Sequence, residues 1–233
     1  MHPISLIINR VAKIFQDIGF KVVDGPELET EWYNFDALNV PPDHPSRDMQ
    51  DTFWIDSKER KVLRTHTSNM QVHAMEEWVK KNKDKMEKGI EVEPLAIICP
   101  GKVYRNEATD ATHEANFYQL ECLFVDKKER VSIPNLKWVI EKYLSELFGR
   151  PTTIRFRSSY FPFVEPALEV DMECFRCEGV GCSTCKNSGY IEILGSGMVH
   201  PKTLEMCGVN SEVYAGFAFG GGIDRIAMML YGI

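Results

Sequence analysis

Residues 100–107 read Pro-Gly-Lys-Val-Tyr-Arg-Asn-Glu, and residues 216–225 read Gly-Phe-Ala-Phe-Gly-Gly-Gly-Ile-Asp-Arg. Each stretch combines an arginine with glycine, whose backbone lets a ligand approach closely. A guanidinium group is always charged and presents a planar fork of donors, which suits bidentate hydrogen bonds to phosphate. Arg105 and Arg225 together therefore indicate a site for a polyphosphate.

The composition is that of an ordinary globular protein with one sizeable core. The chain has 233 residues, of which 44% are hydrophobic and 26% are charged. No apolar run is long enough to span a bilayer, and the N-terminus lacks the features of a signal peptide. We therefore expect a cytoplasmic protein that does not bind membranes. The net charge of −7 argues against nucleic-acid binding through the surface as a whole.

Apolar periodicity and turn residues outline the secondary structure. We expect helices over 3–18, 68–88, 134–148 and 222–231, with Ser68 as an N-cap, the first and third closed by glycine, and the last opened by three glycines. We expect strands over 21–23, 51–55, 95–98, 102–105, 117–125, 152–157, 167–173 and 190–194, with a Pro-Gly turn between the third and fourth. Because strands outnumber the widely separated helices, the sequence predicts an α+β fold with an antiparallel or mixed sheet.

Four of the seven cysteines follow the spacing C-x₂-C-x₄-C-x₂-C, at Cys174, Cys177, Cys182 and Cys185. Two such pairs can close a tetrahedral zinc site in a reducing compartment. No ligand position is left for water, so we expect structural zinc in an insertion over 174–189. Free core cysteines and an iron–sulfur cluster are the alternatives.

Four motifs in order carry a family resemblance: residues 63–68 (Leu-Arg-Thr-His-Thr-Ser), 105–113 (Arg-Asn-Glu-Ala-Thr-Asp-Ala-Thr-His), 159–166 (Ser-Tyr-Phe-Pro-Phe-Val-Glu-Pro) and 216–220. The chain resembles the catalytic core of class II aminoacyl-tRNA synthetases, and within that family the alpha subunits of the bacterial phenylalanine-specific enzymes. This resemblance implies a single catalytic domain over 1–233, with an antiparallel β-sheet flanked by helices and the small four-cysteine zinc-knuckle insertion.

The resemblance also implies an enzyme, a phenylalanine–tRNA ligase. Such an enzyme activates phenylalanine with ATP to phenylalanyl-adenylate and then transfers the amino acid to the terminal ribose of tRNA(Phe). The family's N-terminal coiled-coil arm is expected to be absent here, which would weaken tRNA binding. Pairing through the first long helix, as a homodimer or in a complex with a beta subunit, is also expected.

The ATP site follows from the resemblance. Arg105 is expected to contact the α-phosphate and Arg225 the γ-phosphate. Glu107 is expected to accept a hydrogen bond from the adenine amino group, with Phe117 stacked on the ring and His113 at a phosphate. Catalysis would then consist mainly of positioning and of neutralising charge as pyrophosphate leaves.

The resemblance assigns the amino-acid subsite and a metal as well. Phe161 and Phe163 are expected to lie on one face of an extended segment, with Val164 and Ala218 setting the depth of an apolar slot. The polar rim is expected from His66, Ser68, Gln119, Glu121 and Gly220. Glu165 is expected to ligate Mg²⁺. Cys122, where a smaller residue is usual in the family, is expected to crowd this subsite slightly.

Two alternatives stay open at this stage. The first is a related class II synthetase for another amino acid, such as phosphoserine or pyrrolysine; the apolar slot argues against phosphoserine, which needs cationic partners. The second is a synthetase-like or zinc-binding module without catalysis. The presence of Arg105, Arg225, Glu107 and Glu165 argues against that second alternative.

Overall fold

The computed structural model describes residues 1–47, 52–56, 58–106 and 115–232. Its helices are α1 (Pro3–Asp17), α2 (Glu31–Asn34), α3 (Asn69–Glu87), α4 (Ile133–Phe148), α5 (Pro201–Met206) and α6 (Ile223–Tyr231). Its strands are β1 (Lys21–Val22), β2 (Leu28–Thr30), β3 (Trp54–Asp56), β4 (Lys61–Leu63), β5 (Leu95–Tyr104), β6 (Asn116–Lys127), β7 (Ile154–Phe161), β8 (Val164–Glu173), β9 (Tyr190–Val199) and β10 (Tyr214–Gly222).

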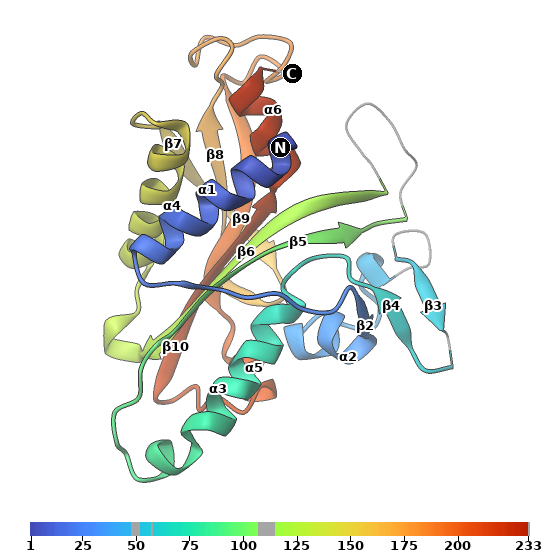
Figure 1. The fold of residues 1–233 in the computed structure, drawn as a ribbon, viewed down its shortest axis with the longest axis vertical. Coiled ribbons are helices and arrows are strands. Elements are labelled where there is room, and N and C mark those ends of the chain that lie inside the picture. Colours follow the sequence, from blue (N-terminus) through green and yellow to red (C-terminus); the bar gives the residue numbers. More distant parts are fainter. Residues whose placement is uncertain (48–51, 57, 107–114, 233) are drawn as a thin grey trace.

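The described strands form one large and one small sheet (Figure 1). Seven of these strands make the large sheet in the order β1-β5-β6-β10-β9-β8-β7, and the small sheet has the order β2-β4-β3. β1 runs parallel to β5, whereas every other pair in the large sheet is antiparallel. The α+β class is confirmed, but the purely antiparallel sheet is wrong at this edge. The long connection between β1 and β5 has room for the crossover that a parallel pair requires.

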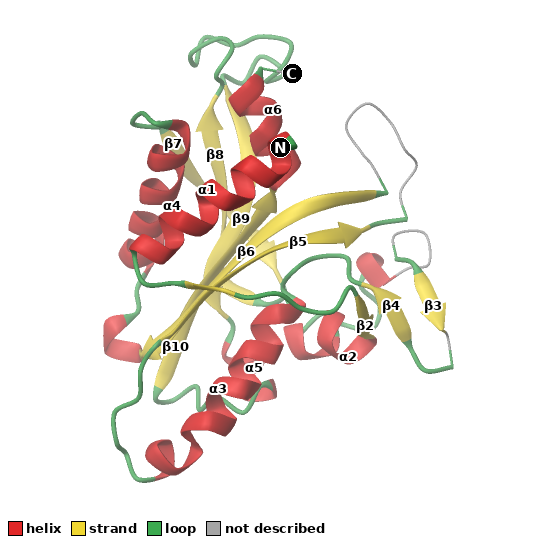
Figure 2. Cartoon of the chain, viewed as in Figure 1, coloured by secondary structure: helices red, strands yellow, loops and turns green. Residues whose placement is uncertain are grey.

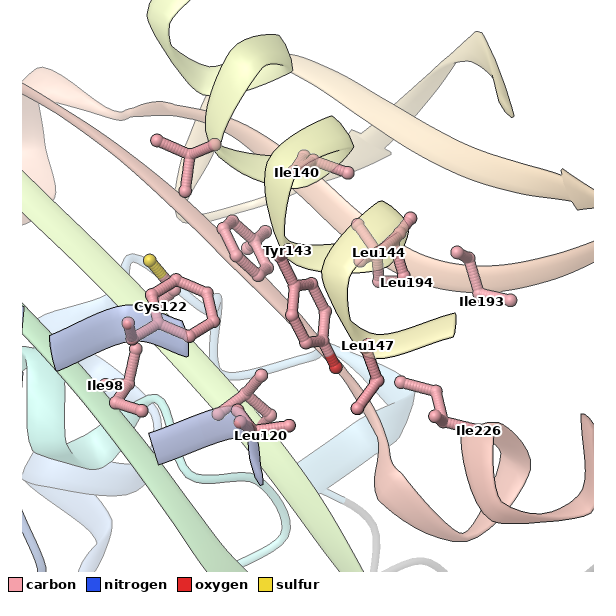
Figure 3. Packing of buried hydrophobic residues seen from close by; sticks show 14 of the residues in the cluster. Ile98, Leu120, Cys122, Ile140, Tyr143, Leu144, Leu147, Ile193, Leu194 and Ile226 are labelled. Carbon is pink, nitrogen blue, oxygen red and sulfur yellow. The ribbon is translucent and has the colours of Figure 1, made fainter. Parts of the chain in front are cut away.

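Helices α1, α4 and α6 pack together on one face of the large sheet (Figure 2). Apolar residues of α1 recur at helical spacing, and this stripe is buried: Ile4, Ile7, Val11, Ile14 and Phe15. Figure 3 shows Tyr143, Leu144 and Leu147 of α4 among side chains of the strands, including Leu120 and Cys122 of β6. Burial of this apolar surface supplies most of the driving force for the layer.

The opposite face of the sheet carries the second core cluster. Because side chains alternate between the two faces along a strand, Leu123 of β6 and Ala218 of β10 point to this face. There they pack with Val72 and Met75 of α3. Cys122 points the other way and is fully buried in the core under α1 and α4. The expected crowding of the substrate side by Cys122 is therefore wrong.

The predicted helices are confirmed to within two residues, and Gly19 and Gly149 end their helices in left-handed conformations, with φ of 92° and 67°. The turn at Pro100-Gly101 is wrong, because β5 runs through both residues. β1 pairs only with Ile97 and Ile98, so β5 has no described neighbour on that side at Pro100. A proline is tolerated at such an open edge because no ladder hydrogen bond is lost.

Other elements were not predicted from the sequence. The glycine run at 220–222 ends β10 instead of opening a helix, and α6 starts at Ile223. Strands β2, β4 and β10 and the short helices α2 and α5 had no expected counterpart. Within the part of the chain that the structure describes, no helix combines the length and the apolar character needed to cross a membrane.

Candidate active site

A buried carboxylate lies between β6 and the start of α3. Glu121 is 6% exposed, and the Ser68 hydroxyl donates to its Oε2 at 2.9 Å. The Gln71 amide donates to its Oε1. Burial raises the pKa of Glu121 to about 8, although both hydrogen bonds oppose the shift. The structure therefore brings Ser68 and Glu121 together as expected. With this pKa, the Glu121 carboxyl group is mostly protonated near neutral pH.

Two details of this polar group differ from the sequence analysis. Ser68 occupies the N-cap position of α3, but its hydroxyl makes no capping bond and is directed to Glu121 instead. Gln71 was not anticipated; its position one helical turn after Ser68 was the available signal. Gly220 lies opposite Glu121 in the register of β10 and β6. A Cβ atom at Gly220 would lie 2.7 Å from Glu121 Oε2, so only glycine leaves this carboxylate in place.

An aromatic pair stands at the junction of β7 and β8. The rings of Phe161 and Phe163 stack with centroids 6.0 Å apart and an interplanar angle of 17°. They do not alternate along an extended segment: Phe161 ends β7, and Phe163 lies in the turn that leads to β8. The turn reverses the chain and brings the rings together. The Asn39 side chain donates to Pro162 O at 2.7 Å and supports this turn.

Glycines on β9 leave the space that this aromatic pair occupies. A Cβ atom at Gly195 would lie 2.9 Å from the Phe161 ring. Gly197 is the register partner of Ala218 on β10 and of Ala167 on β8. Val164 and Ala218 are 5% and 2% exposed and belong to the same apolar cluster, against which both phenylalanines pack. The four residues expected to form an apolar slot thus lie on one side of the sheet.

The first arginine motif ends beside Phe117. Arg105 follows β5, and the carbon of its guanidinium lies 5.1 Å from the centre of the Phe117 ring. Its Nε donates to Thr65 O at 3.3 Å. Such a cation–π pair leaves an aromatic face and a charged fork next to each other.

The second arginine motif reaches the same end of β6. Asp224 accepts a hydrogen bond from the Tyr118 backbone N–H at 2.6 Å, and Gly222 pairs with Gln119. Arg225 is exposed on α6, and its Nη1 donates to Glu192 O on β9 at 3.0 Å. The two motifs therefore converge on residues 117–119, although the two guanidinium groups have different hydrogen-bond partners.

His66 lies in the loop before α3, two residues before Ser68. Its Nδ1 is buried and has no hydrogen-bond partner among the described residues. Burial lowers the pKa of His66 to about 4, and the charge of Arg105 adds to this effect. The imidazole is therefore neutral at about pH 7. Two further expected residues, Glu107 and His113, lie outside the described residues.

Glu165, the residue expected to ligate Mg²⁺, is exposed near the start of β8. Its side chain is 74% exposed, and its Oε2 lies 3.3 Å from Nε2 of His200. Mg²⁺ is usually held by one or two protein carboxylates together with phosphate oxygens and water, and an exposed carboxylate such as Glu165 can serve as such a ligand.

The four clustered cysteines lie in the loop that joins β8 and β9. Their sulfurs all lie within 4.8 Å of one another. The Sγ atoms of Cys174 and Cys182 are 3.8 Å apart, and those of Cys177 and Cys185 are 3.7 Å apart. A zinc ion with bonds of about 2.3 Å to four tetrahedral sulfurs requires sulfur separations of about 3.8 Å. Disulfide bonds, at about 2.05 Å, are excluded.

Backbone N–H groups point at these sulfurs. Gly181 N–H donates to Cys177 Sγ at 3.2 Å, and Gly189 N–H donates to Cys185 Sγ at 3.3 Å. The backbone N–H of Cys185 is the main reason that the pKa of Cys182 falls to about 6. Burial acts the other way and raises the pKa of Cys177 to about 11, so the N–H groups favour the thiolate at Cys182 but not at every cysteine of the cluster. The thiolate is the form that binds a metal. A Cβ atom at Gly189 would lie 2.3 Å from Gly179 O, so the tight turn requires glycine.

Comparison with known proteins supports one family. Residues 1–233 match the family described as tRNA synthetases class II core domain (F). The chain is 51% identical to the phenylalanine–tRNA ligase alpha subunits of Geobacillus thermodenitrificans and Geobacillus kaustophilus, and 50% identical to that of Bacillus mycoides. These alignments cover 100% of this chain but 63% of each relative.

The fold is also similar to solved structures. The crystal structure of pyrrolysyl-tRNA synthetase from Desulfitobacterium hafniense superposes with a TM-score of 0.69 at 18% identity, covering 98% of this chain and 70% of that one. At this identity the likeness concerns the fold alone. The match to the family over the whole chain is the decisive finding: the protein belongs to the class II tRNA synthetase core family.

Proposed function

We propose that this chain activates phenylalanine with ATP, forming phenylalanyl-adenylate and pyrophosphate, as the catalytic core of a phenylalanine–tRNA ligase. The observation that carries this proposal is the placement of the Phe161–Phe163 pair on the same face of the sheet as the Glu121–Ser68 group. An aromatic cluster beside a buried acid is suited to an amino acid with a benzyl side chain and an ammonium group. The names of the relatives, at 51% and 50% identity, support the same substrate.

In this proposal, the benzyl ring packs against Phe161 and Phe163 above Val164 and Ala218. The ammonium group is held by Glu121, and Gln119, His66 and Gly220 complete the rim. The substrate carboxylate is then free to attack the α-phosphorus of ATP, which forms a carboxyl–phosphate bond and breaks the bond to pyrophosphate. The protein contributes orientation and charge stabilisation and no covalent step.

Arg105 and Phe117 are proposed to hold the α-phosphate and the adenine. Arg225 is proposed to reach the γ-phosphate from α6, exchanging its bond with the Glu192 carbonyl for one with phosphate. Glu165 is proposed to hold Mg²⁺, which supplies additional neutralisation of phosphate charge when bound.

The larger partners belong to the same proposal. tRNA(Phe) is the proposed acceptor, and the name of the relatives, alpha subunit, supports assembly with a second type of subunit. We also propose that Cys174, Cys177, Cys182 and Cys185 bind one structural zinc ion, because their sulfur separations fit a tetrahedral site. A cytoplasmic location accords with this, since thiols stay reduced there.

The test of the proposed function is ATP–pyrophosphate exchange with each amino acid in turn. Exchange that depends on phenylalanine, with tyrosine as a weak substrate, is the expected result. An apolar site rejects one added hydroxyl group by only about 10²-fold. Exchange driven by an unrelated amino acid, or no exchange with any amino acid, would overturn the proposal.

Replacing Ala218 by glycine is expected to admit larger substrates. Ala218 is 2% exposed among the apolar residues of the proposed subsite, so removal of its methyl group makes room near the substrate ring. Para-substituted phenylalanines should then be activated at least tenfold better than by the parent, since one methyl group in a pocket contributes about 1–3 kcal/mol of discrimination. Exchange rates with para-chlorophenylalanine measure this, and no gain would place the substrate elsewhere.

Phenylalanine binding is expected to strengthen as the pH rises. Glu121 is buried, with a pKa of about 8, so little of it is ionised at about pH 6. If the ammonium group requires the carboxylate, the dissociation constant should fall roughly 50-fold from about pH 6 to about pH 8. Calorimetric titration of Glu121→Gln supplies the control: that variant should bind weakly at every pH. A pH-independent affinity in the parent would contradict this role.

The same carboxyl affects folding with the opposite sign. Its pKa in the folded chain lies above the ordinary value of 4.5, so the folded state binds the proton more tightly than the unfolded state does. The contribution of Glu121 to stability is therefore fully present below about pH 4.5 and is lost as the pH rises toward about 8.

A further inference from the structure

Arg64 is the largest side chain in the fully buried interior, with 1% of its surface exposed. It follows β4 directly and precedes the loop that carries His66 and Ser68. Burying a guanidinium group is unfavourable unless its charge is paired or its donors are satisfied. The partners of Arg64 therefore show what this residue does.

These partners are backbone carbonyls from two separate segments. Nε donates to Lys102 O at 2.7 Å, and Nη1 donates to Gly25 O at 3.2 Å. The backbone of Arg64 joins the same segments, because its N–H donates to Glu27 O and its carbonyl accepts from Tyr104 N–H, both at 2.9 Å. Among the described residues, no carboxylate lies within ion-pair distance of this guanidinium.

One of these segments, 102–104, and the loop that follows Arg64 lead to the two halves of the proposed site. Tyr104 is followed by Arg105, and Arg105 in turn donates to Thr65 O at 3.3 Å. Three residues beyond Thr65, the Ser68 hydroxyl reaches Glu121 at 2.9 Å. Arg64 is thus the side chain that ties the amino-acid rim to the end of the strand that carries the ATP arginine.

We propose that Arg64 is a positioning residue, which fixes loop 65–68 against the end of β5 and so sets the distance between the substrate carboxylate and the Arg105 guanidinium. This inference rests on the proposed function. The planar guanidinium group of Arg64 can donate hydrogen bonds to several carbonyl groups at fixed angles, which a lysine ammonium group cannot reproduce. The charge of Arg64, with no carboxylate beside it, also lowers the pKa of the neighbouring His66. Burial and the charge of Arg105 lower that pKa more.

A positioning role has a kinetic signature. Phenylalanine and ATP would each keep their own contacts, on the aromatic cluster and on Phe117, so the two KM values should change little. Their mutual orientation would be lost, and a misplacement of about 1 Å can lower the rate of a reaction about 10²-fold. Loss of Arg64 should therefore appear in kcat for adenylate formation.

Two variants displace the guanidinium in different ways. In Gly101→Ala, the new Cβ atom would lie 2.3 Å from Nη2 of Arg64 and 3.1 Å from Cγ2 of Thr67, so the end of the arginine must move most, and Thr67 by a few tenths of an ångström. This variant keeps the charge and creates no cavity. Arg64→Lys keeps the charge but removes the fork. We expect both to lower kcat for phenylalanine-dependent exchange about 10- to 100-fold, with both KM values within about threefold of the parent.

Leu144→Ala is the matched control for lost stability. Leu144 is fully buried in the core on the other face of the sheet and touches none of the proposed site. Rates are counted per active site, from the adenylate formed in a single turnover. Leu144→Ala should have the kcat of the parent on this scale.

The outcomes separate this inference from the proposed function. Exchange by the parent, with reduced kcat in Gly101→Ala and Arg64→Lys, supports the role of Arg64. Exchange by the parent together with an unchanged kcat per active site in both variants would overturn it while leaving the proposed function intact. A parent chain without phenylalanine-dependent exchange would overturn the proposed function, and the role of Arg64 with it.

Discussion

Arg105→Ala is expected to lower phenylalanine-dependent pyrophosphate exchange by about 10²–10³-fold, the range seen when one preorganised charge-stabilising donor is removed. Arg105 is half-buried, its Nε is bonded to Thr65 O, and its guanidinium lies beside Phe117. The side chain is therefore held in place before substrate binds. Negative charge develops on the α-phosphate as pyrophosphate leaves, and the loss of this donor should lower kcat more than it raises KM for ATP.

Two further variants serve as comparisons for Arg105→Ala. Arg105→Lys keeps the charge but loses the planar fork, so its exchange rate should lie between those of the parent and the alanine variant. Arg130→Ala removes another arginine, whose guanidinium is bonded to Glu91 at the surface, and it should exchange at the parental rate. Equal rates for Arg105→Ala and Arg130→Ala would show that the α-phosphate site lies elsewhere.

Loss of a single clustered thiol is expected to remove the metal. The parent should contain about one zinc per chain, and Cys182→Ser should contain almost none, because a structural site needs all four sulfurs. The melting temperature should fall on the order of 10 °C, since metal binding in such knuckles is folding free energy.

Elemental analysis and limited proteolysis measure this effect. Cleavage should appear between 174 and 189 in Cys182→Ser and in chelator-treated parent, and it should be absent from zinc-loaded parent. Cys207→Ser is the control, because Cys207 is buried near α5, away from the cluster, and its loss should leave the zinc content unchanged. A colourless parent free of zinc and resistant to cleavage would contradict the zinc site, and iron in its place would favour a cluster.

Local sequence patterns were sufficient for the helices α1, α3, α4 and α6 and for the cysteine cluster. The apolar stripe of α1 and the glycines after α1 and α4 act within a few residues, so a single sequence contains the information. The paired spacing of the four cysteines similarly determines which thiols can meet. The family motifs predicted the members of the candidate site, of which the structure brings together Ser68 with Glu121 and Phe161 with Phe163.

Contacts between distant segments could not be predicted in this way. Ser68 looks like a helix cap in sequence, yet its hydroxyl bonds to Glu121, 53 positions away. Pro100-Gly101 looks like a turn, yet the pair continues β5, because it pairs with Leu120 and Gln119 of β6, while no described strand lies on its other side. The parallel pairing of β1 likewise depends on β5, which is distant in the sequence, so local patterns do not predict this pairing. The same holds for Arg64, whose carbonyl partners lie 38 and 39 positions away.

Calorimetric binding of a non-hydrolysable phenylalanyl-adenylate, with a sulfamate in place of the phosphate, tests most directly whether one site holds both halves of the reaction. We expect one analogue bound per chain, at least about 10³-fold more tightly than phenylalanine alone, as for an intermediate analogue that spans two subsites. Arg105→Ala should weaken this binding, and the tyrosyl analogue should bind less tightly than the phenylalanyl analogue. An analogue that binds no better than phenylalanine, or equally well in Arg105→Ala, would contradict a single shared site.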